Sequence, residues 1–338
     1  MEKIKIIQIG ICHEHAAGKF DSLKKLDDVF ELVGYVDERS FCKTPCREPA
    51  MKHYEGYRAL TLEEALNCPG LQATAVEVPN NDLVRVAMMC AERGLPMHLD
   101  KPAGVDLPLY KQLLDLCQAK KLPFQMGYMF RGNPAFRFCI RAVREKLLGE
   151  VFEITADMNH CYGGDSYREY IGKFPGGLMY VLGCHLIDFA VAALGCPENV
   201  TSSLRSAPGD PAAWHTNCLA VLEYPGALVS IRSCCKDVAN TGGRAMKIAG
   251  TNGTIHFSPL ERFDGKGVEV SLRLKEDRGG FPAGTHTLVF PPQRDRYEEQ
   301  LRELARMIRG EAESPYSFEH DCLVHKVTLA ASNLIQWR

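Results

Sequence analysis

The sequence lacks an excess of charge of either sign. Its 338 residues contain 40 Lys and Arg against 42 Asp and Glu, so the formal net charge is −2. A surface that binds nucleic acid needs clustered positive charge to neutralise phosphates, and this composition supplies no surplus for one. We therefore expect no nucleic-acid partner.

The sequence also lacks a bilayer-length hydrophobic run that is free of ionisable groups. The longest weakly charged stretch, 176–196, carries His185 and Asp188 near its middle, where ionisable side chains are rare in membrane helices. A buried core helix with functional polar residues explains this stretch better. Nothing after Met1 resembles a secretory leader. We expect a cytoplasmic protein with no membrane partner.

C-x-x-C pairs are absent, although the chain has fourteen cysteines. Cys42 and Cys46 are four residues apart, and Cys234 and Cys235 are adjacent. Neither spacing suits structural zinc, which needs convergent ligands. We therefore expect reduced thiols, without disulfides and without a metal site.

The first third of the chain instead contains an alternation of strand-like and helix-like patterns. β-branched runs bounded by Gly or Pro predict the strands, and apolar residues at helical spacing predict the helices. The predicted strands are 4–9, 30–37, 73–78, 97–99 and 124–129, and the predicted helices are 20–26, 62–66, 83–93 and 107–121. Such alternation is typical of a doubly wound parallel sheet that binds ligands beyond the carboxyl ends of its strands.

The pattern changes after Gly149 to alternating apolar segments separated by turn residues, which predict an antiparallel sheet. The predicted strands are 151–158, 218–224, 227–234, 246–249, 254–257 and 268–274. One long helix, 178–194, leads into this region, and two more helices are predicted over 296–308 and 319–333. We divide the chain into residues 1–125, which would hold a cofactor, and residues 126–338, which would hold substrate. An open antiparallel sheet leaves a large face to cover, so we expect a homo-oligomer, a dimer or a tetramer.

The turn after the first predicted strand, 10–15, is compatible with dinucleotide binding. It keeps only the first glycine of a G-x-G-x-x-G motif, so an ordinary strand–helix turn is the alternative. Gly10 can make the tight turn, and Cys12 is small enough for backbone amides to approach a pyrophosphate. Asp37 ends the second strand, where a carboxylate accepts hydrogen bonds from ribose hydroxyls and repels a 2′-phosphate. The cofactor is therefore expected to be NAD, while the nearby Arg39 keeps NADP open.

Four short motifs in one order carry a resemblance to a known family. They are Pro79-Asn80, Asp100-Lys101-Pro102, the helix segment 176–188 that begins Gly176-Gly177, and Gly250-Thr251-Asn252-Gly253-Thr254. Over nearly the whole chain the set resembles the Gfo/Idh/MocA family of glucose–fructose oxidoreductase-like and inositol dehydrogenase-like enzymes. The resemblance implies an N-terminal Rossmann domain followed by a C-terminal α/β domain with a large, open, mainly antiparallel sheet. It also implies an NAD(P)-dependent oxidoreductase that acts on a secondary hydroxyl of a sugar, cyclitol or related polyol.

The chain departs from the family pattern at the degenerate glycine turn and at three further positions. Leu83 replaces a histidine, Asp100 replaces a glutamate, and Val181 replaces an aspartate that is usually counted as catalytic. Two other functions therefore stay open. One is an NAD-dependent glycosidase or lyase that oxidises a sugar transiently without net redox change. The other is a catalytically inactive NAD-binding sensor, which Val181 and the degenerate turn favour slightly.

Lys101 and His185 are the predicted catalytic residues. Pro102 holds Lys101 in an extended backbone at a strand end, where its ammonium group can stabilise a developing alkoxide. His185 matches the histidine of the family's helix motif and would accept the hydroxyl proton. Asp188 follows on the same helical face and could orient the imidazole ring. The alternatives are a surface lysine and a histidine satisfied within the core.

Further site residues follow from position and from the resemblance. Arg131 is expected near the nicotinamide or in an interdomain salt bridge, and His160 and Tyr162 either bind a sugar hydroxyl or form a polar turn. His13 and His15 either contact pyrophosphate or substrate, or cap a helix. The predicted substrate-binding residues are Arg131, His160, Tyr162 and Asp188, and the predicted cofactor-binding residues are Gly10, Cys12, His13, His15, Asp37, Pro79, Asn80, Asp100 and Lys101.

Overall fold

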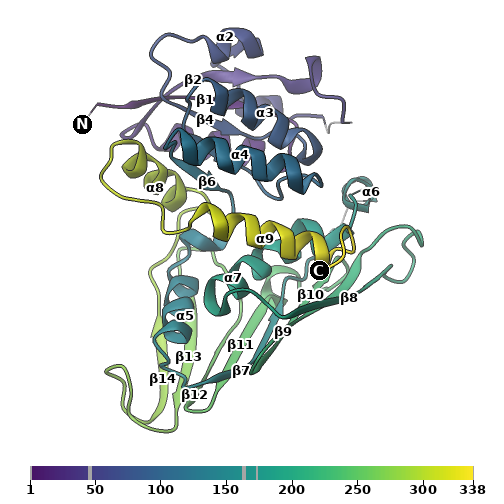
Figure 1. Cartoon of the computed structure of the whole chain (residues 1–338), viewed down its shortest axis with the longest axis vertical. Helices are drawn as coiled ribbons and strands as arrows, with labels where there is room; N and C mark the ends of the chain where they lie inside the picture. Colours follow the sequence, from purple (N-terminus) through teal and green to yellow (C-terminus); the bar gives the residue numbers. More distant parts are fainter. Residues whose placement is uncertain (1, 45–47, 162–164, 173, 338) are drawn as a thin grey trace. The chain divides into compact units, whose positions relative to one another are not determined.

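The computed structural model describes residues 2–44, 48–161, 165–172 and 174–337. They form two compact units (Figure 1). The first unit comprises Met1–Met129 and Asp295–Cys322, and the second comprises Phe130–Arg294 and Leu323–Arg338. The division predicted at residue 125 lies close to the boundary at Met129, and the later segment Asp295–Cys322 returns to the first unit.

The first unit is built on a six-stranded sheet in the order β3-β2-β1-β4-β5-β6, in which every neighbouring pair is parallel. The strands are β1 (Ile4–Ile9), β2 (Phe30–Val36), β3 (Arg58–Leu60), β4 (Ala73–Val76), β5 (Met97–Leu99) and β6 (Phe124–Met126). All of β4 and almost all of β1 is buried, because helices cover both faces of a doubly wound sheet. The chain order reverses direction between β1 and β4, which makes their carboxyl ends the expected ligand edge.

Helices flank this sheet on both sides. They are α1 (Ala16–Lys25), α2 (Leu62–Leu66), α3 (Asn80–Glu92), α4 (Leu107–Ala119) and α8 (Glu298–Ile308). α3 packs on α4 and against β4 and β5, whereas α1 packs on α8. Leu23 of α1, Leu301 of α8 and Ile6 of β1 share one buried apolar cluster, which fixes α8 to the sheet despite its distance in the sequence. Thr61 begins α2 with a capping box to Glu64, as its spacing in the sequence predicts.

The second unit contains an eight-stranded sheet in the order β14-β13-β12-β11-β7-β10-β9-β8. Its strands are β7 (Val151–Asp157), β8 (Asn199–Arg205), β9 (Asn217–Tyr224), β10 (Ala227–Cys234), β11 (Ala245–Gly250), β12 (Gly253–Phe257), β13 (Glu269–Leu274) and β14 (Gly284–Val289). Among the described strands of this sheet, only β7 and β10 pair in parallel, and the other neighbours are antiparallel. In β9 buried residues alternate with half-buried ones, as expected for a sheet covered on one face.

Two helices and a π-helical turn form the layer on this sheet. α5 (Pro134–Arg144) packs on α7 (Cys184–Leu194), and α7 is preceded by the π-helical turn η4 (Met179–Gly183). The predicted single helix over 178–194 is therefore divided, with Val181 in the wider turn and His185 in the regular helix. A short helix, α6 (Asp165–Gly172), lies between β7 and this turn, and the last helix is α9 (Phe318–Ala331).

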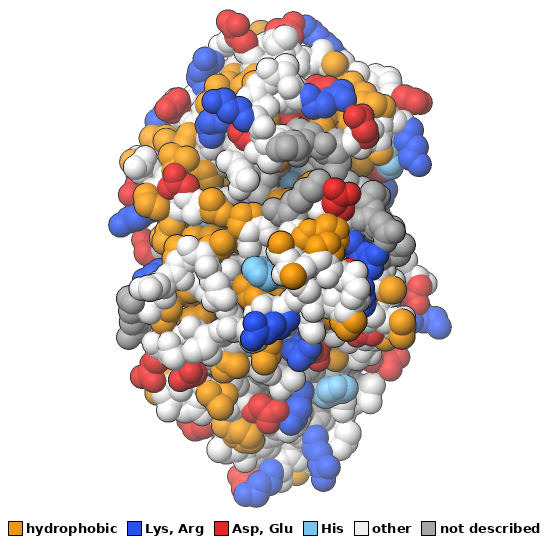
Figure 2. Space-filling view, turned by 90° about the vertical axis from the view of Figure 1, so that its right-hand side faces the viewer, with side chains coloured by type: hydrophobic (Ala, Val, Ile, Leu, Met, Phe, Trp, Pro, Cys, Tyr) orange, Lys and Arg blue, Asp and Glu red, His pale blue; other side chains and the backbone are white. Residues whose placement is uncertain are grey.

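The predicted fold class is confirmed: a parallel doubly wound sheet with helices, and a second α/β unit with a mainly antiparallel sheet. Among the residues that the structure describes, no helix is both long and apolar enough to cross a bilayer. On the face drawn in Figure 2, basic and acidic side chains both occur, in keeping with the near-neutral composition.

Candidate functional site

The glycine turn after β1 approaches the end of β4 so closely that no side chain fits there. Gly10 has φ +107°, and a Cβ atom on it would lie 2.4 Å from the carbonyl carbon of Glu77. Both the backbone conformation and the contact therefore require glycine. This confines the turn to the carboxyl edge of the sheet, directly before α1, as a phosphate-binding turn requires.

Two backbone N–H groups of this turn donate hydrogen bonds to a carboxylate. Glu38, at the end of β2, accepts hydrogen bonds from the N–H groups of Ile11 at 2.8 Å and Cys12 at 2.9 Å. Glu38 is fully buried. Burial raises the pKa of its carboxyl group, although both hydrogen bonds oppose this rise. This contact was not predicted from the sequence, because Glu38 stands next to Asp37, the carboxylate expected to bind ribose.

Asp37 lies where a ribose-binding carboxylate is expected, at the end of β2, and it is partly exposed. It pairs with Arg39, whose Nε and Nη2 donate to both of its oxygens at 2.6–3.1 Å. These hydrogen bonds from Arg39 hold the pKa of Asp37 below its ordinary value in spite of partial burial. The guanidinium group is therefore next to any group that Asp37 would bind.

Lys101 is held at the carboxyl end of β5 by its neighbours. Lys101 is 1% exposed, and its backbone N–H donates to Asp100 Oδ1 at 2.6 Å. The peptide bond between Lys101 and Pro102 is cis. The side-chain amide of Asn80 donates to the carbonyl oxygens of Lys101 and Pro102 at 3.1 and 3.0 Å. Asn80, which follows Pro79 at the start of α3, thus fixes the backbone that presents Lys101.

His13, His15 and Asp100 come together beside Lys101. Asp100 Oδ2 lies 3.0 Å from His13 Nδ1 and 2.9 Å from His15 Nδ1. Burial alone would lower the pKa of His13, but the carboxylates of Glu14, Asp100 and Glu77 outweigh it and raise this pKa to about 9. For His15, burial dominates and lowers the pKa, although Asp100 opposes it.

The pKa values of the carboxylates around these histidines are shifted in opposite directions. Burial would raise the pKa of Glu14, but His13, His15 and Lys101 lower it to about 2. Burial likewise opposes ionisation of Asp100, and His15 and His13 keep its pKa well below the ordinary value. Burial and the negative charge of Asp100 raise the pKa of Glu77 well above its ordinary value. The charge of Lys101 acts on Glu14, which places both at this edge of the sheet.

A polar chain behind this cluster was missed by sequence reasoning. Lys19 Nζ contacts His98 Nε2 and lies 3.7 Å from Glu77 Oε1. The other ring nitrogen of His98 pairs with Gln125 Oε1 at 2.9 Å. Burial and the charge of Lys19 lower the pKa of His98 to about 3, so this ring is neutral. An ionisable residue inside an otherwise apolar strand, such as His98 between Met97 and Leu99, is the signal that could have found it.

In the second unit, His185 and Asp188 are buried on α7, but Asp188 is engaged elsewhere. Arg131 donates to its two oxygens from Nε at 3.1 Å and from Nη2 at 2.6 Å, and both residues are 3% exposed. The His185 ring instead makes an edge contact with Phe130, with ring centroids 5.7 Å apart. The predicted Arg131 and Asp188 thus form a buried ion pair within this unit, which locks the segment before α5 to α7.

The remaining predicted residues take other positions. His160 follows β7, and its backbone N–H donates to the carbonyl of Cys234 at 2.7 Å, which pairs it with the end of β10. Tyr162 lies outside the described residues. Lys101 and the cofactor residues belong to the first unit, whereas His185, Arg131, Asp188 and His160 belong to the second.

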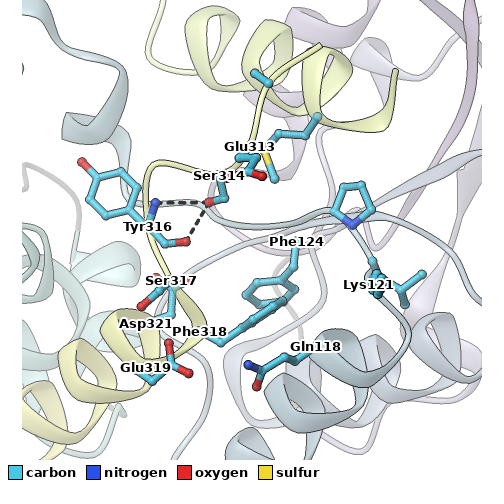
Figure 3. Close-up of a pocket in the computed structure, with 14 residues that line it drawn as sticks. Gln118, Lys121, Phe124, Glu313, Ser314, Tyr316, Ser317, Phe318, Glu319 and Asp321 are labelled. Atoms are coloured by element: carbon cyan, nitrogen blue, oxygen red, sulfur yellow. Dashed lines mark hydrogen bonds between the residues drawn. The ribbon is translucent and has the colours of Figure 1, made fainter. Parts of the chain in front are cut away.

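A pocket of about 480 Å³ lies at the other edge of the first unit's sheet, at the amino end of β6 (Figure 3). Phe124 and Phe318 line it, and their ring centroids are 6.0 Å apart. Ser314 caps the backbone of Tyr316 at its rim, where its hydroxyl donates to the carbonyl oxygen at 2.8 Å. None of its lining residues is a predicted site residue, so this pocket is separate from the cluster of His13, His15, Asp100 and Lys101.

A dinucleotide fits the first unit in two respects. The turn at Gly10 has the glycine that close approach requires, and Asp37 has the carboxylate that a ribose requires at the end of β2. Glu38 is the feature that such a ligand would have to accommodate, because its carboxylate already accepts from two amides of the turn.

Comparison with known proteins yields one family match and several relatives. Residues 136–256 match the GFO/IDH/MocA C-terminal domain. The chain is 25% identical over 263 residues to a D-xylose 1-dehydrogenase (NADP+) of Haloferax volcanii, which covers 75% of this chain and 74% of that protein. It is also 25% identical over 226 residues to an uncharacterised oxidoreductase of Schizosaccharomyces pombe, which covers 66% of this chain and 60% of the relative.

The fold has close counterparts among solved structures. One is an oxidoreductase from Agrobacterium radiobacter in complex with NAD+, L-tartaric acid and magnesium, with a TM-score of 0.78 and 16% identity. The superposition covers 97% of this chain and 95% of that one. At this identity the similarity shows the fold alone.

Proposed function

The chain belongs to the GFO/IDH/MocA family, and on that premise we propose that it transfers a hydride between a nicotinamide dinucleotide and a secondary hydroxyl of a sugar, cyclitol or related polyol. The observation that carries the proposal is Lys101, buried at the carboxyl edge of the parallel sheet next to the glycine turn. That edge is where doubly wound sheets bind their ligands. The named relative acts on D-xylose with NADP+, which supports a sugar-like substrate.

Six of the predicted residues have a role in this proposal. The turn at Gly10 and the start of α1 would hold the pyrophosphate, and Asp37 would accept from the ribose hydroxyls. The nicotinamide, when bound, supplies the hydride acceptor. Lys101 would stabilise the alkoxide, because a buried ammonium has a strong field on a developing negative charge. His185 would accept the hydroxyl proton, and the Arg131–Asp188 pair would position α7 rather than take part in proton transfer.

The test is turnover by the full chain with NAD+ and NADP+ over a broad polyol panel. Lys101→Met and His185→Asn should each lower kcat at least about 100-fold, the usual contribution of a positioned acid, base or oxyanion donor. Lys111→Met on the exposed side of α4 and His256→Asn on β12 are matched controls, since both residues are exposed. Near-normal turnover by either site variant contradicts its assigned role.

Two outcomes would favour the other functions. Dinucleotide binding without hydride exchange over the whole panel would indicate a sensor, which the Glu38 contact with the glycine turn and Val181 both favour. Release of free sugar from a glycoside without accumulation of reduced cofactor would indicate the transiently oxidising enzyme.

We also propose that the chain forms a homo-oligomer, as the sheet of the second unit suggests. Every second residue of β10 is buried, while the intervening Leu228 is 58% exposed and Arg232 is exposed as well. This face carries apolar as well as charged groups, which is typical of a subunit interface. Light scattering after size exclusion should give a dimer or tetramer mass, and a monomer at micromolar concentration would refute it.

A further inference from the structure

Two histidines and an aspartate converge at the carboxyl edge of the first unit's sheet. His13 and His15 lie in the turn after β1, and Asp100 follows β5. One potential ligand atom from each of the three residues lies within 4.8 Å of the other two. The backbone N–H of His15 also donates to His13 Nδ1 at 3.3 Å. Both imidazoles direct the same type of nitrogen at a single carboxylate oxygen, at 3.0 and 2.9 Å.

This three-residue cluster is shielded from solvent except on one side. The side chains of His13 and Asp100 are 0% and 2% exposed, whereas that of His15 is 24% exposed. A ligand could therefore reach the cluster past His15, while His13 and Asp100 remain shielded from solvent. Three protein donors with one accessible side is the arrangement of an open, rather than a closed, metal site.

Further carboxylates lie close to the cluster. Glu77 Oε2 lies 4.0 Å from His13 Nδ1, and Glu14 Oε2 lies 3.7 Å from His13 Nε2. Together with Asp100, three carboxylates share a region where their side chains are at most 7% exposed. Buried carboxylates are costly unless a cation compensates them. Lys19 lies 3.7 Å from Glu77 Oε1 and Lys101 acts on Glu14, so these lysines balance part of the charge, and a divalent cation at Asp100 would balance more of it.

Neighbouring groups hold the donor atoms in place. The backbone N–H of Lys101 donates to Asp100 Oδ1 at 2.6 Å, which leaves Oδ2 directed at the histidines. Gly127 leaves room beside the carboxylate, because a Cβ there would lie 3.3 Å from Asp100 Oδ1. Such second contacts orient the donors of metal sites and tune their affinity.

We propose that His13, His15 and Asp100 form an open binding site for one divalent transition metal ion of the zinc class. Imidazole and carboxylate donors suit Zn²⁺, and three of them leave a fourth position for water on the side of His15. Tetrahedral zinc bonded at about 2.0–2.1 Å separates its ligand atoms by roughly 3.3 Å. The two separations from Asp100 Oδ2, 3.0 and 2.9 Å, would each have to widen by about 0.3–0.4 Å. This site goes beyond the proposed hydride transfer, and its test does not depend on that function.

The test uses the full chain, stripped with a chelator and kept free of dinucleotide. Titration with Zn²⁺ should give one equivalent bound by calorimetry and by elemental analysis after desalting. Co²⁺ should give the visible absorption of a tetrahedral site, without the near-ultraviolet band of cobalt–thiolate bonds. Because binding is measured without substrate or cofactor, failure here leaves the proposed function untouched.

Two variants and two controls assign the donors. His15→Ala and Asp100→Asn should each weaken Zn²⁺ binding at least about tenfold, the low end for losing a contact in a metal site. Asp100→Asn retains the oxygen that accepts from Lys101, so it stands in if His15→Ala misfolds. His53→Ala removes a histidine that makes a single ion pair with Asp21 at 2.6 Å and should leave binding unchanged.

Cys12→Ala is the second control, because Cys12, Asp37 and Glu38 form another group of potential donors. Retention of Zn²⁺ by both His15→Ala and Asp100→Asn, or its loss in Cys12→Ala, would overturn the assignment. Absence of stoichiometric binding by the unaltered chain would show that the three residues form a hydrogen-bonded ion cluster only.

Discussion

Glu38 is the residue whose contacts most affect ligand binding at the glycine turn. Its carboxylate accepts hydrogen bonds from two backbone N–H groups of the turn where a pyrophosphate would bind. The carboxylate also places a negative charge at that turn. Glu38→Gln removes that charge but keeps one acceptor oxygen. We predict that it tightens dinucleotide binding about three- to tenfold, roughly 0.7–1.4 kcal/mol. Fluorescence titration of the full chain with NAD+ and NADP+ measures this.

The matched control is Glu63→Gln, an exposed carboxylate on α2 of the same unit. Its dinucleotide affinity should equal that of the unaltered chain. Weaker binding by Glu38→Gln would mean that the carboxylate shapes the turn for the ligand instead of competing with it.

At the same scale, the sequence predicts residues at the site better than it predicts their partners. His13, His15, Asp100 and Lys101 could be selected because they stand in turns after predicted strands, and such turns share one sheet edge. Their pairing depends on side-chain directions over more than eighty residues of separation, as in the contact between His15 and Asp100. Periodicity carries no information about that distance.

The sequence predicts a strand best where both faces of that strand are buried, because its side chains must then be apolar. β1 and β4 are apolar runs since both of their faces are covered, and both were predicted. The three strands that the sequence did not reveal, β3, β8 and β14, are all at the edges of their sheets. An edge strand buries fewer side chains, so polar segments such as that of β8 lack the alternation on which prediction depends.

The start of α8 supplies a prediction about pH. Burial would raise the pKa of Asp295, but hydrogen bonds from the backbone N–H groups of Tyr297 and Glu298 and from Ser22 outweigh it and lower this pKa. A lowered folded-state pKa stabilises the fold above the unfolded pKa of about 3.9, and this contribution is lost as pH falls through the folded pKa. Asp295→Asn should therefore cost about 1 kcal/mol at pH 7 and progressively less below about pH 4.

Urea unfolding of both proteins between pH 7 and pH 3 checks this difference. Asp27→Asn, at an exposed position of the same unit, corrects for the general loss of negative charge. A stability difference that stays constant over this range would show that Asp295 acts through packing and not through its charge.

For the molecule as a whole, the cysteines give the most direct test of burial. The described cysteines are all free thiols, and both units contain buried ones. Burial raises the pKa of Cys90 and Cys117 to about 12 and that of Cys218 and Cys235 to about 11. The nucleophile in alkylation is the thiolate, so these thiols are protected both by access and by protonation. The buried set is Cys12, Cys90, Cys117, Cys139, Cys184, Cys218 and Cys235.

We predict that iodoacetamide at neutral pH labels Cys196 first, because it is the exposed thiol among the described cysteines. The half-buried Cys42, Cys68, Cys161, Cys234 and Cys322 should follow more slowly. The buried set should react only after unfolding in urea, which peptide mass spectrometry resolves site by site. Since each unit contributes buried thiols, rapid native labelling of Cys90 would contradict the packing of the first unit, and rapid labelling of Cys218 would contradict that of the second.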